Sequence, residues 1–283
     1  MSLLSALLWQ SILRIIIGVI VAIPLALYPM LYFFQEKLIF HPRQEEKDFS
    51  LKHLQAIHSS VERISLNTQS GFELHGFLVP STAKDVGKGW VIYFGGNKEL
   101  TSDWLADVPS MPEWSLLAVD YRGYGRSTGQ PGEEALSEDA LLLYDRFIAR
   151  QDGKPVRVVA MGRSLGSGVA VYLAANRPVS GVILITPYDS LVEVAQGYYP
   201  YVPVSWLLKH RFDSLTIAPR LTMPALFLIA GKDIIIHPYH AERLADAWHG
   251  PKQIIRYVNA DHDNIPLVAS YWQNIHGFLT DLP

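Results

Sequence analysis

The stretch RVVAMGRSLGSGVAVYLAA, residues 157–175, decides the fold that we expect for this chain. It opens with an apolar run typical of a β-strand, turns at GRSLG and continues in small residues typical of a helix. Gly-x-Ser-x-Gly between a strand and a helix predicts a turn too sharp for side chains on either flank. This turn pushes the Ser164 hydroxyl out of the sheet, to a helix N-terminus whose dipole favours developing negative charge.

Apolar runs and helical patterns alternate along most of the remaining chain. Continuous apolar runs are typical of strands buried on both faces of a parallel sheet, and they occupy residues 90–96, 115–121, 156–162, 181–187, 225–231 and 253–259. Helical patterns fall between or after them, at 135–150, 165–176, 239–248 and 270–281. Residues 61–80 alternate apolar and polar residues around a Gln-Ser-Gly turn, which predicts an antiparallel hairpin. We therefore expect a doubly wound, mostly parallel α/β sheet with helices on both faces.

Composition excludes several classes of function. The 283-residue chain carries a net charge of −3, which gives no reason to expect nucleic acid as a partner. It contains no cysteine, so disulfides, thiolate metal sites and cysteine nucleophiles are excluded. No glycine-rich phosphate loop or dinucleotide fingerprint occurs, and His237 and His240 lack further ligands at metal-binding spacing. The sequence predicts no cofactor and no metal.

The N-terminal segment is apolar enough to enter a membrane. Residues 15–34 carry no charge, and twenty helical residues rise about 30 Å, the thickness of a bilayer core. Pro24 and Pro29 are tolerated in membrane helices. We expect an uncleaved, single-pass membrane anchor over residues 1–36, with a cleaved signal peptide as the main alternative. Basic residues on both sides of the segment leave its orientation open.

Three motifs carry a resemblance to a known family: GRSLGSGVA at 162–170, DYRGYGRS at 120–127 and HRFDSL at 210–215. Over about residues 36–282 the chain resembles α/β-hydrolases, specifically small membrane-anchored serine hydrolases related to the eukaryotic protein depalmitoylases and the serine aminopeptidase-like group. The resemblance implies an α/β-hydrolase fold and esterase-like chemistry. It also implies a cap over the active site, within a catalytic domain that spans residues 37–283.

The interval 187–222 is long for a connection between two core strands, and such insertions are more often functional than idle. It contains six aromatic residues, Tyr188, Tyr198, Tyr199, Tyr201, Trp206 and Phe212. We expect this segment to form the cap and its aromatic side chains, Trp206 among them, to line a pocket for an acyl chain. The alternative is that they pack the cap onto the sheet.

A serine nucleophile needs a base, and the base needs an orienting carboxylate. In an α/β hydrolase these follow in the order Ser, Asp or Glu, His, on loops after late strands. His262 follows the last predicted strand, and Asp233 follows the penultimate one. We predict a catalytic triad of Ser164, His262 and Asp233. Asp189, which follows an earlier strand, is the alternative acid.

The oxyanion of an acyl-transfer intermediate needs two N–H donors. One is expected to be the backbone N–H of Leu165, directly after the nucleophile. The other is expected from the loop after residues 90–96, from either Asn97 or Gly96. The related enzymes usually carry His-Gly where this chain has Gly-Gly, a change that a backbone donor survives.

These residues and the resemblance predict a serine hydrolase that cleaves an acyl ester or thioester through an acyl-enzyme. Its substrate would be a small-molecule or lipid-like acyl compound, and its N-terminal helix would hold it in a membrane. Two alternatives stay open: a serine peptidase of the aminopeptidase type on the same triad, and a non-catalytic, membrane-bound binding protein with a hydrolase fold. The sequence leaves the natural substrate, the side of the membrane and the oligomeric state open.

Overall fold

One eight-stranded sheet forms the centre of the molecule. The computed structural model describes residues 3–46, 51–83, 89–148 and 156–282. The strands follow the order β1-β2-β4-β3-β5-β6-β7-β8, with β1 and β2 antiparallel and β3 to β8 parallel to one another. They are β1 Glu62–Asn67, β2 Glu73–Val79, β3 Gly89–Phe94, β4 Trp114–Val119, β5 Arg157–Arg163, β6 Gly181–Ile185, β7 Ala225–Ala230 and β8 Lys252–Tyr257. The predicted hairpin and mostly parallel sheet are confirmed.

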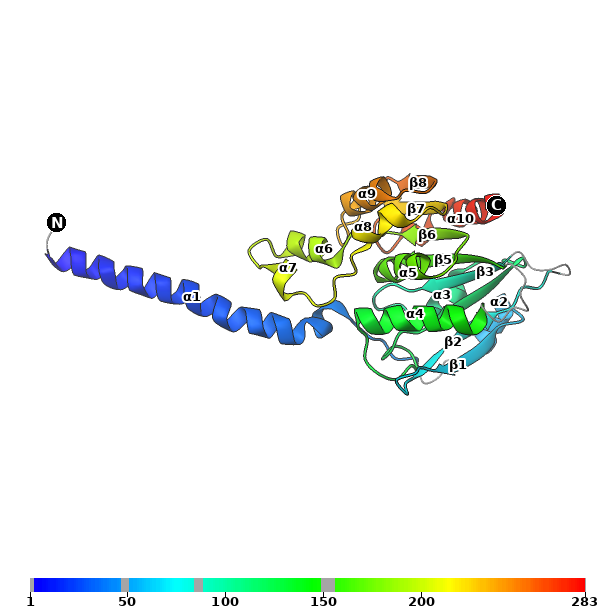
Figure 1. Cartoon of the computed structure of the whole chain (residues 1–283), viewed down its shortest axis with the longest axis horizontal. Helices are drawn as coiled ribbons and strands as arrows, with labels where there is room; N and C mark the ends of the chain where they lie inside the picture. Colours follow the sequence, from blue (N-terminus) through cyan, green and yellow to red (C-terminus); the bar gives the residue numbers. More distant parts are fainter. Residues whose placement is uncertain (1–2, 47–50, 84–88, 149–155, 283) are drawn as a thin grey trace.

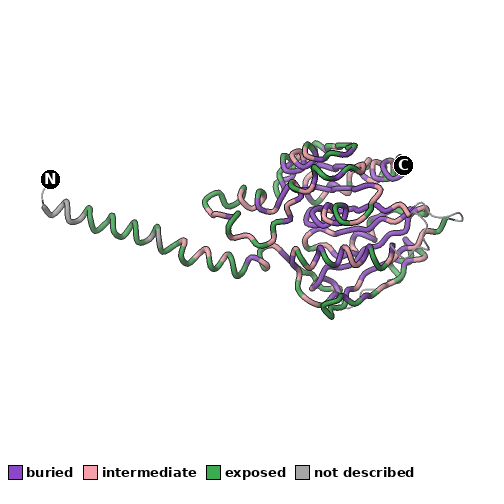
Figure 2. Tube along the Cα trace, viewed as in Figure 1, coloured by how far each residue is buried: buried purple, intermediate pink, exposed green. Residues whose placement is uncertain are grey.

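The central strands of the sheet are mostly buried (Figure 2). Their alternate residues pack into two separate apolar layers. In β5, Val158 faces the layer that contains α4, α5 and α9, and Val159 faces the layer that contains α2, α3 and α10. A strand covered on both faces needs apolar residues at every position, which explains its continuous apolar run. The helices are α2 Leu51–Ile57, α3 Thr101–Asp107, α4 Glu133–Phe147, α5 Leu165–Asn176, α9 Pro238–Ala247 and α10 Tyr271–Asp281.

All four predicted helices of the α/β part are present, although residues 149 and 150 of the predicted 135–150 helix lie outside the described part of the chain. The short helices α2 and α3 had no counterpart among the predicted elements. Each has only seven residues, too few to display a clear helical period of apolar residues.

A single long helix, α1 Leu3–Ile39, projects from the α/β part (Figure 1). The stretch Trp9–Ile39 is long and apolar enough to cross a membrane, and most of its described apolar side chains are exposed. Pro24 and Pro29 lie inside the helix. The helix continues without interruption through residue 36 and ends beside the cap.

The segment between β6 and β7 runs from beside the end of α1 back to α5 (Figure 1). It consists of short helices, α6 Leu191–Tyr198, α7 Val204–Leu207, α8 Ser214–Ile217 and the 3₁₀ turn η1 Ala218–Arg220. Ser190 caps α6, because its hydroxyl accepts from the Glu193 N–H at 3.1 Å. Below, we call residues 187–217 the cap. A second 3₁₀ turn, η2 Ile265–Leu267, precedes α10.

Candidate active site

The turn between β5 and α5 holds Ser164 in a strained conformation. Its φ of 50° and ψ of −118° lie in a region that residues with side chains rarely adopt. A Cβ atom on Gly162 would overlap the Gly166 carbonyl, and one on Gly166 would overlap the Phe94 carbonyl. Both glycines are therefore required by close backbone contacts, and the serine between them is presented at the N-terminus of α5.

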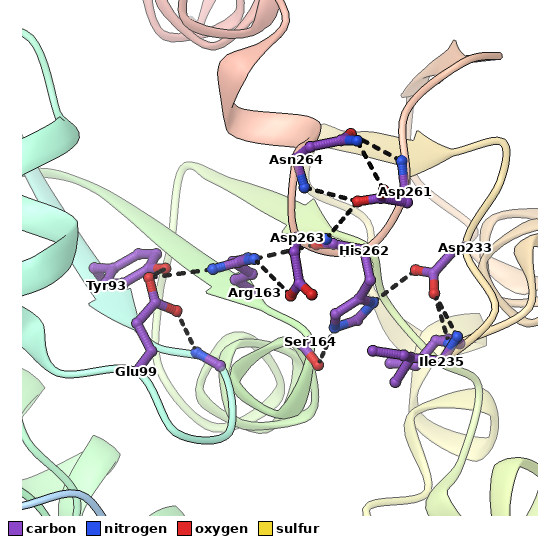
Figure 3. Close-up of polar contacts among 12 residues, drawn as sticks. Tyr93, Glu99, Arg163, Ser164, Asp233, Ile235, Asp261, His262, Asp263 and Asn264 are labelled. Atoms are coloured by element: carbon purple, nitrogen blue, oxygen red, sulfur yellow. Dashed lines mark hydrogen bonds and ion pairs between the residues drawn. The ribbon is translucent and has the colours of Figure 1, made fainter.

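Ser164, His262 and Asp233 lie together in a hydrogen-bonded row (Figure 3). The Ser164 Oγ lies 3.0 Å from His262 Nε2, and His262 Nδ1 lies 2.7 Å from Asp233 Oδ2. A carboxylate can only accept, so Nδ1 carries the ring proton and Nε2 is left to accept from the serine hydroxyl. This arrangement allows His262 to take the proton of Ser164.

The loop after β7 fixes the Asp233 carboxylate. Its second oxygen, Oδ1, accepts hydrogen bonds from the backbone N–H groups of Ile235 and Ile236, at 2.9 and 2.8 Å. These two donors hold the orientation of the carboxylate toward His262. Asp233 and His262 are both buried, so bulk water does not compete for these contacts.

Asp189, the alternative acid, contacts a different histidine. Its Oδ1 lies 2.8 Å from His240 Nδ1, and its Oδ2 lies 2.9 Å from the guanidinium of Arg243. Asp189 also accepts from the Ser190 N–H at the start of the cap. These contacts join the cap to α9 and do not involve His262.

The predicted oxyanion donors differ in their hydrogen bonding. The Gly96 N–H donates to Glu99 Oε2 at 2.6 Å and is therefore occupied. Within the described part of the chain, the backbone N–H groups of Asn97 and Leu165 have no partner. Asn97, Leu165 and Ser164 line the same pocket, so these two N–H groups remain available to a developing oxyanion.

A second polar network lies behind the serine (Figure 3). Glu99 accepts from the Tyr93 hydroxyl at 3.0 Å and forms an ion pair with Arg163 at 3.5 Å, besides its bond to Gly96. Arg163 in turn donates to the His262 carbonyl at 3.1 Å. The network ties the loop after β3 to the histidine loop through the residue that precedes Ser164. This network was not predicted from the sequence, because Glu99 belongs to no motif and Arg163 occupies a variable position of the Gly-x-Ser-x-Gly turn.

A pocket of about 420 Å³ lies over Ser164, a size typical of small-molecule sites. It is mostly apolar, and no acidic or basic side chain lines it among the described residues. Its walls come from α1, from the loops around Ser164 and from the cap. The α1 residues are Leu31, Gln35, Leu38 and Ile39, and the cap residues include Leu191, Val194, Ala195, Tyr198, Tyr199, Val202, Val204 and Leu207.

The aromatic residues of the cap divide into three groups. Tyr188, Tyr198 and Tyr199 line the pocket, as predicted for the segment. Phe212 is buried in the apolar layer that contains α5. The expectation for Trp206 is wrong: Trp206 is 86% exposed and Tyr201 is 94% exposed, and neither lines the pocket. A hydrogen bond joins Leu207 of α7 to Gln35 of α1 at 3.1 Å, a long-range contact that a sequence pattern of scattered aromatic residues does not reveal.

Comparisons with known proteins agree with this fold. The family model of the S33 serine aminopeptidases matches residues 103–219, a range that includes Ser164 but ends before Asp233 and His262. An acetyl xylan esterase from Paenibacillus sp. R4 has a similar structure, with a TM-score of 0.61 and 17% identity over 88% of this chain and 99% of the esterase.

Two relatives are similar in sequence. The uncharacterized protein Rv2307c of Mycobacterium tuberculosis is 30% identical over 207 residues, which cover 72% of this chain and 73% of the relative. The uncharacterized membrane protein YNL320W of Saccharomyces cerevisiae is 30% identical over 173 residues, which cover 59% of this chain and 61% of the relative. With its strand order, its elbow and these similarities, the chain belongs to the α/β-hydrolase superfamily.

Proposed function

We propose that this protein is a membrane-anchored serine hydrolase that cleaves an acyl ester or thioester through an acyl-enzyme. The observation that carries this proposal is the row Ser164–His262–Asp233, with the serine hydroxyl at the floor of an apolar pocket. A dedicated base next to a hydroxyl that lines a pocket is what nucleophilic catalysis requires. Helix α1, long and apolar enough to span a bilayer, would hold the enzyme in the membrane.

In the proposed reaction, His262 removes the Ser164 proton while Oγ attacks the acyl carbonyl carbon. The carbonyl oxygen becomes an oxyanion, which the N–H groups of Leu165 and Asn97 stabilise. His262 then gives the proton to the leaving alcohol or thiol, and the acyl group stays on Ser164. Water, deprotonated by His262, attacks the acyl-enzyme, and His262 returns this proton to Ser164 Oγ as the bond to the acyl group breaks and the carboxylic acid is released. Asp233 stabilises the imidazolium in both steps.

The alternative function is that of a serine aminopeptidase, which the family model suggests by its description. A peptide with a free N-terminus carries a positive charge that has to be matched when it is removed from water. No carboxylate lines the pocket among the described residues, and its polar groups are Gln35, Asn97, Ser164 and tyrosine hydroxyls. The pocket therefore favours a neutral, apolar acyl group over a peptide N-terminus.

A fluorophosphonate probe and a substrate panel test this proposal. The probe should label the wild-type protein in detergent and leave Ser164→Ala unlabelled. p-Nitrophenyl esters and acyl thioesters should be hydrolysed, and kcat/KM should rise from acetyl towards medium chains, by a few-fold per added methylene. Faster cleavage of aminoacyl amides than of esters would favour the peptidase. A wild-type protein that neither reacts with the probe nor cleaves any substrate would support the non-catalytic alternative.

A further inference from the structure

The end of α1 is a wall of the pocket. Leu31, Gln35, Leu38 and Ile39 follow one another at helical spacing and share the pocket with Ser164. Residues 15–34 would fill the hydrocarbon core of a bilayer, about 30 Å, so this wall begins inside the expected span and ends just beyond it. The pocket would therefore open where hydrocarbon gives way to lipid headgroups.

Hydrogen bonds fasten α1 to the cap on one side of this wall. Gln35 is buried, its Nε2 donates to the Leu207 carbonyl at 3.1 Å, and its Oε1 accepts from the Lys209 N–H at 2.7 Å. The Lys209 ammonium also forms an ion pair with Glu36 at 3.2 Å. The relative position of helix and cap is thus fixed by a buried amide that uses both its donor and its acceptor.

On the other side, α1 is fastened to the oxyanion loop. The Asn97 side chain donates to the Ile39 carbonyl at 2.6 Å and accepts from the His41 N–H at 2.9 Å. It thereby satisfies backbone groups at the C-terminal end of α1, where carbonyls lack partners within the helix. The helix that would cross the membrane is therefore joined directly to Asn97, a pocket residue that we expect to donate its backbone N–H to the oxyanion.

Exposed aromatic residues surround this junction. Tyr199, Tyr201 and Trp206, which we call the cap rim, are 53%, 94% and 86% exposed. They belong to or flank the helices α6 and α7, which lie beside the end of α1 on the side from which that helix projects (Figure 1). Tyr and Trp are enriched at membrane–water interfaces, because their rings are apolar and their hydroxyl or N–H groups reach water.

We infer that the cap rim rests in the interfacial layer of the same bilayer that holds α1, and that the acyl chain of a membrane-resident substrate enters the pocket laterally, between α1 and the cap. This inference rests on the proposed function for the identity of the reaction. The bilayer is the occupant that fits the rim, because α1 would bring it to this face and to no other described face of the molecule. The chain would lie along Leu31 and Leu38 while its carbonyl group reaches Ser164.

The position of the cap rim can be measured directly, since the chain has no native cysteine. Trp206→Cys gives a unique site for an environment-sensitive nitrobenzoxadiazole label in the full-length protein, reconstituted in phosphatidylcholine vesicles. The control is Ile254→Cys, an exposed position on the edge strand β8. Brominated phosphatidylcholine should quench the label at position 206 and leave the label at 254 unchanged. Equal, water-like emission at both positions would overturn the inference.

The lateral entry is tested with two substrates and two matched variants. Leu31→Trp adds bulk to the pocket wall, whereas Phe33→Trp places the same indole on an exposed side of the same helical turn. In vesicles, Leu31→Trp should lower kcat/KM for vesicle-embedded p-nitrophenyl palmitate by about tenfold or more. Its effect on soluble p-nitrophenyl acetate should be much smaller, so that the palmitate-to-acetate ratio of kcat/KM falls, whereas Phe33→Trp should change neither activity.

The outcomes separate this inference from the proposed function. Equal hydrolysis of the palmitate ester by the Leu31→Trp and Phe33→Trp proteins would contradict lateral entry along α1, while the chemistry at Ser164 would stand. A wild-type protein that is inactive on both esters would contradict the proposed function. Quenching at position 206 is measured in the Ser164→Ala background as well, so that the membrane contact of the rim is judged without reference to activity.

Discussion

At the scale of single residues, the two histidine–carboxylate pairs have different surroundings. Asp233 contacts His262, which contacts Ser164, whereas Asp189 contacts His240 and Arg243 away from the serine. Only the first pair can orient a base toward the nucleophile. The second pair joins the first residues of the cap to α9, so its expected contribution is to the stability of the cap.

The first prediction compares these two acids. Asp233→Asn should lower kcat by about three to four orders of magnitude, because the amide stabilises the wrong tautomer of His262 and cannot stabilise its cation. Asp189→Asn should retain most of the activity and lower the free energy of unfolding by about 1–3 kcal/mol. Steady-state kinetics on a short ester and denaturant titrations measure the two effects. Loss of activity in Asp189→Asn with full activity in Asp233→Asn would move the acid to Asp189.

The second prediction concerns Arg163 as a positioning residue. Its guanidinium holds the His262 carbonyl and pairs with Glu99, which in turn holds the loop that carries Asn97. Arg163→Met should lower kcat by about 10- to 100-fold with little change in KM, because small misplacements of reacting groups are costly. The matched control is Arg177→Met, which removes an exposed ion pair with Asp145 and should leave kcat unchanged. A rise in KM alone would argue against a positioning role.

Much of the site could be predicted from the sequence because its members follow strands in a fixed order. The elbow requires glycine at 162 and 166, and Asp233 and His262 come directly after apolar runs that could only be strands. The network of Glu99 and Arg163 could not be predicted, since it depends on how the loop after β3 and the end of β5 approach each other in space. Equally, no pattern distinguished Gly96 from Asn97 as a donor.

At the scale of elements, a buried carboxylate joins the end of β4 to the start of α3. Asp120 Oδ1 accepts from the Thr101 N–H at 2.8 Å, at the first residue of α3. Burial is the main cause that raises the pKa of Asp120 from 3.8 to about 6. The folded protein therefore holds this proton more tightly than the unfolded chain does, and deprotonation opposes folding.

The third prediction is the pH dependence that follows from Asp120. Its contribution to stability is fully present below about pH 4 and is lost as the pH rises towards 6. The difference between the two pKa values corresponds to about 3 kcal/mol. Relative to Asp120→Asn, which keeps an acceptor for Thr101, the wild-type free energy of unfolding should fall by up to about that amount over this range. Denaturant titrations in detergent at several pH values measure the difference.

Asp145 provides a control, because its effect on stability should depend on pH in the opposite direction. The hydrogen bond from Arg177 is the main cause that lowers the pKa of this carboxyl, so its stabilising contribution is lost as the pH falls. As the pH rises, the free energy of unfolding of the wild-type protein should therefore increase relative to that of Asp145→Asn, whereas it should decrease relative to that of Asp120→Asn. A wild-type protein and an Asp120→Asn protein with parallel pH profiles would contradict the role assigned to Asp120.

The sheet was easier to predict than the cap for a physical reason. Parallel strands covered on both faces must be apolar throughout, and this leaves an unmistakable pattern. The orientation of α7 depends instead on Gln35, which contacts Leu207 across 172 positions of sequence. The sequence thus located the cap, but it did not indicate that Trp206 points away from the pocket.

At the scale of the whole molecule, α1 belongs to the pocket as well as to the expected anchor. The fourth prediction compares two truncations. A chain that begins at residue 31 keeps the pocket wall and the contact of Ile39 with Asn97, so it should leave the membrane and retain activity on soluble esters. A chain that begins at residue 41 loses both, so it should be less stable and less active. Carbonate extraction and hydrolysis of p-nitrophenyl butyrate measure the two properties.

Two results would contradict this view of α1. Equal activity of the two truncated proteins would show that the helix makes no contribution to the site. If expression of the full-length chain yields a mature protein that begins after residue 30, the segment is a cleaved signal peptide instead of an anchor.

The central claim is that Ser164 forms a covalent acyl-enzyme, and rapid-quench mass spectrometry tests it most directly. The wild-type protein is mixed with a p-nitrophenyl acyl ester, quenched in acid within the first turnover and digested. We expect a peptide containing Ser164 that is heavier by the mass of one acyl group, together with a burst of p-nitrophenol. The Ser164→Ala protein should give neither the modified peptide nor the burst. Turnover without any acylated Ser164 peptide, or acylation of a different residue, would contradict the central claim.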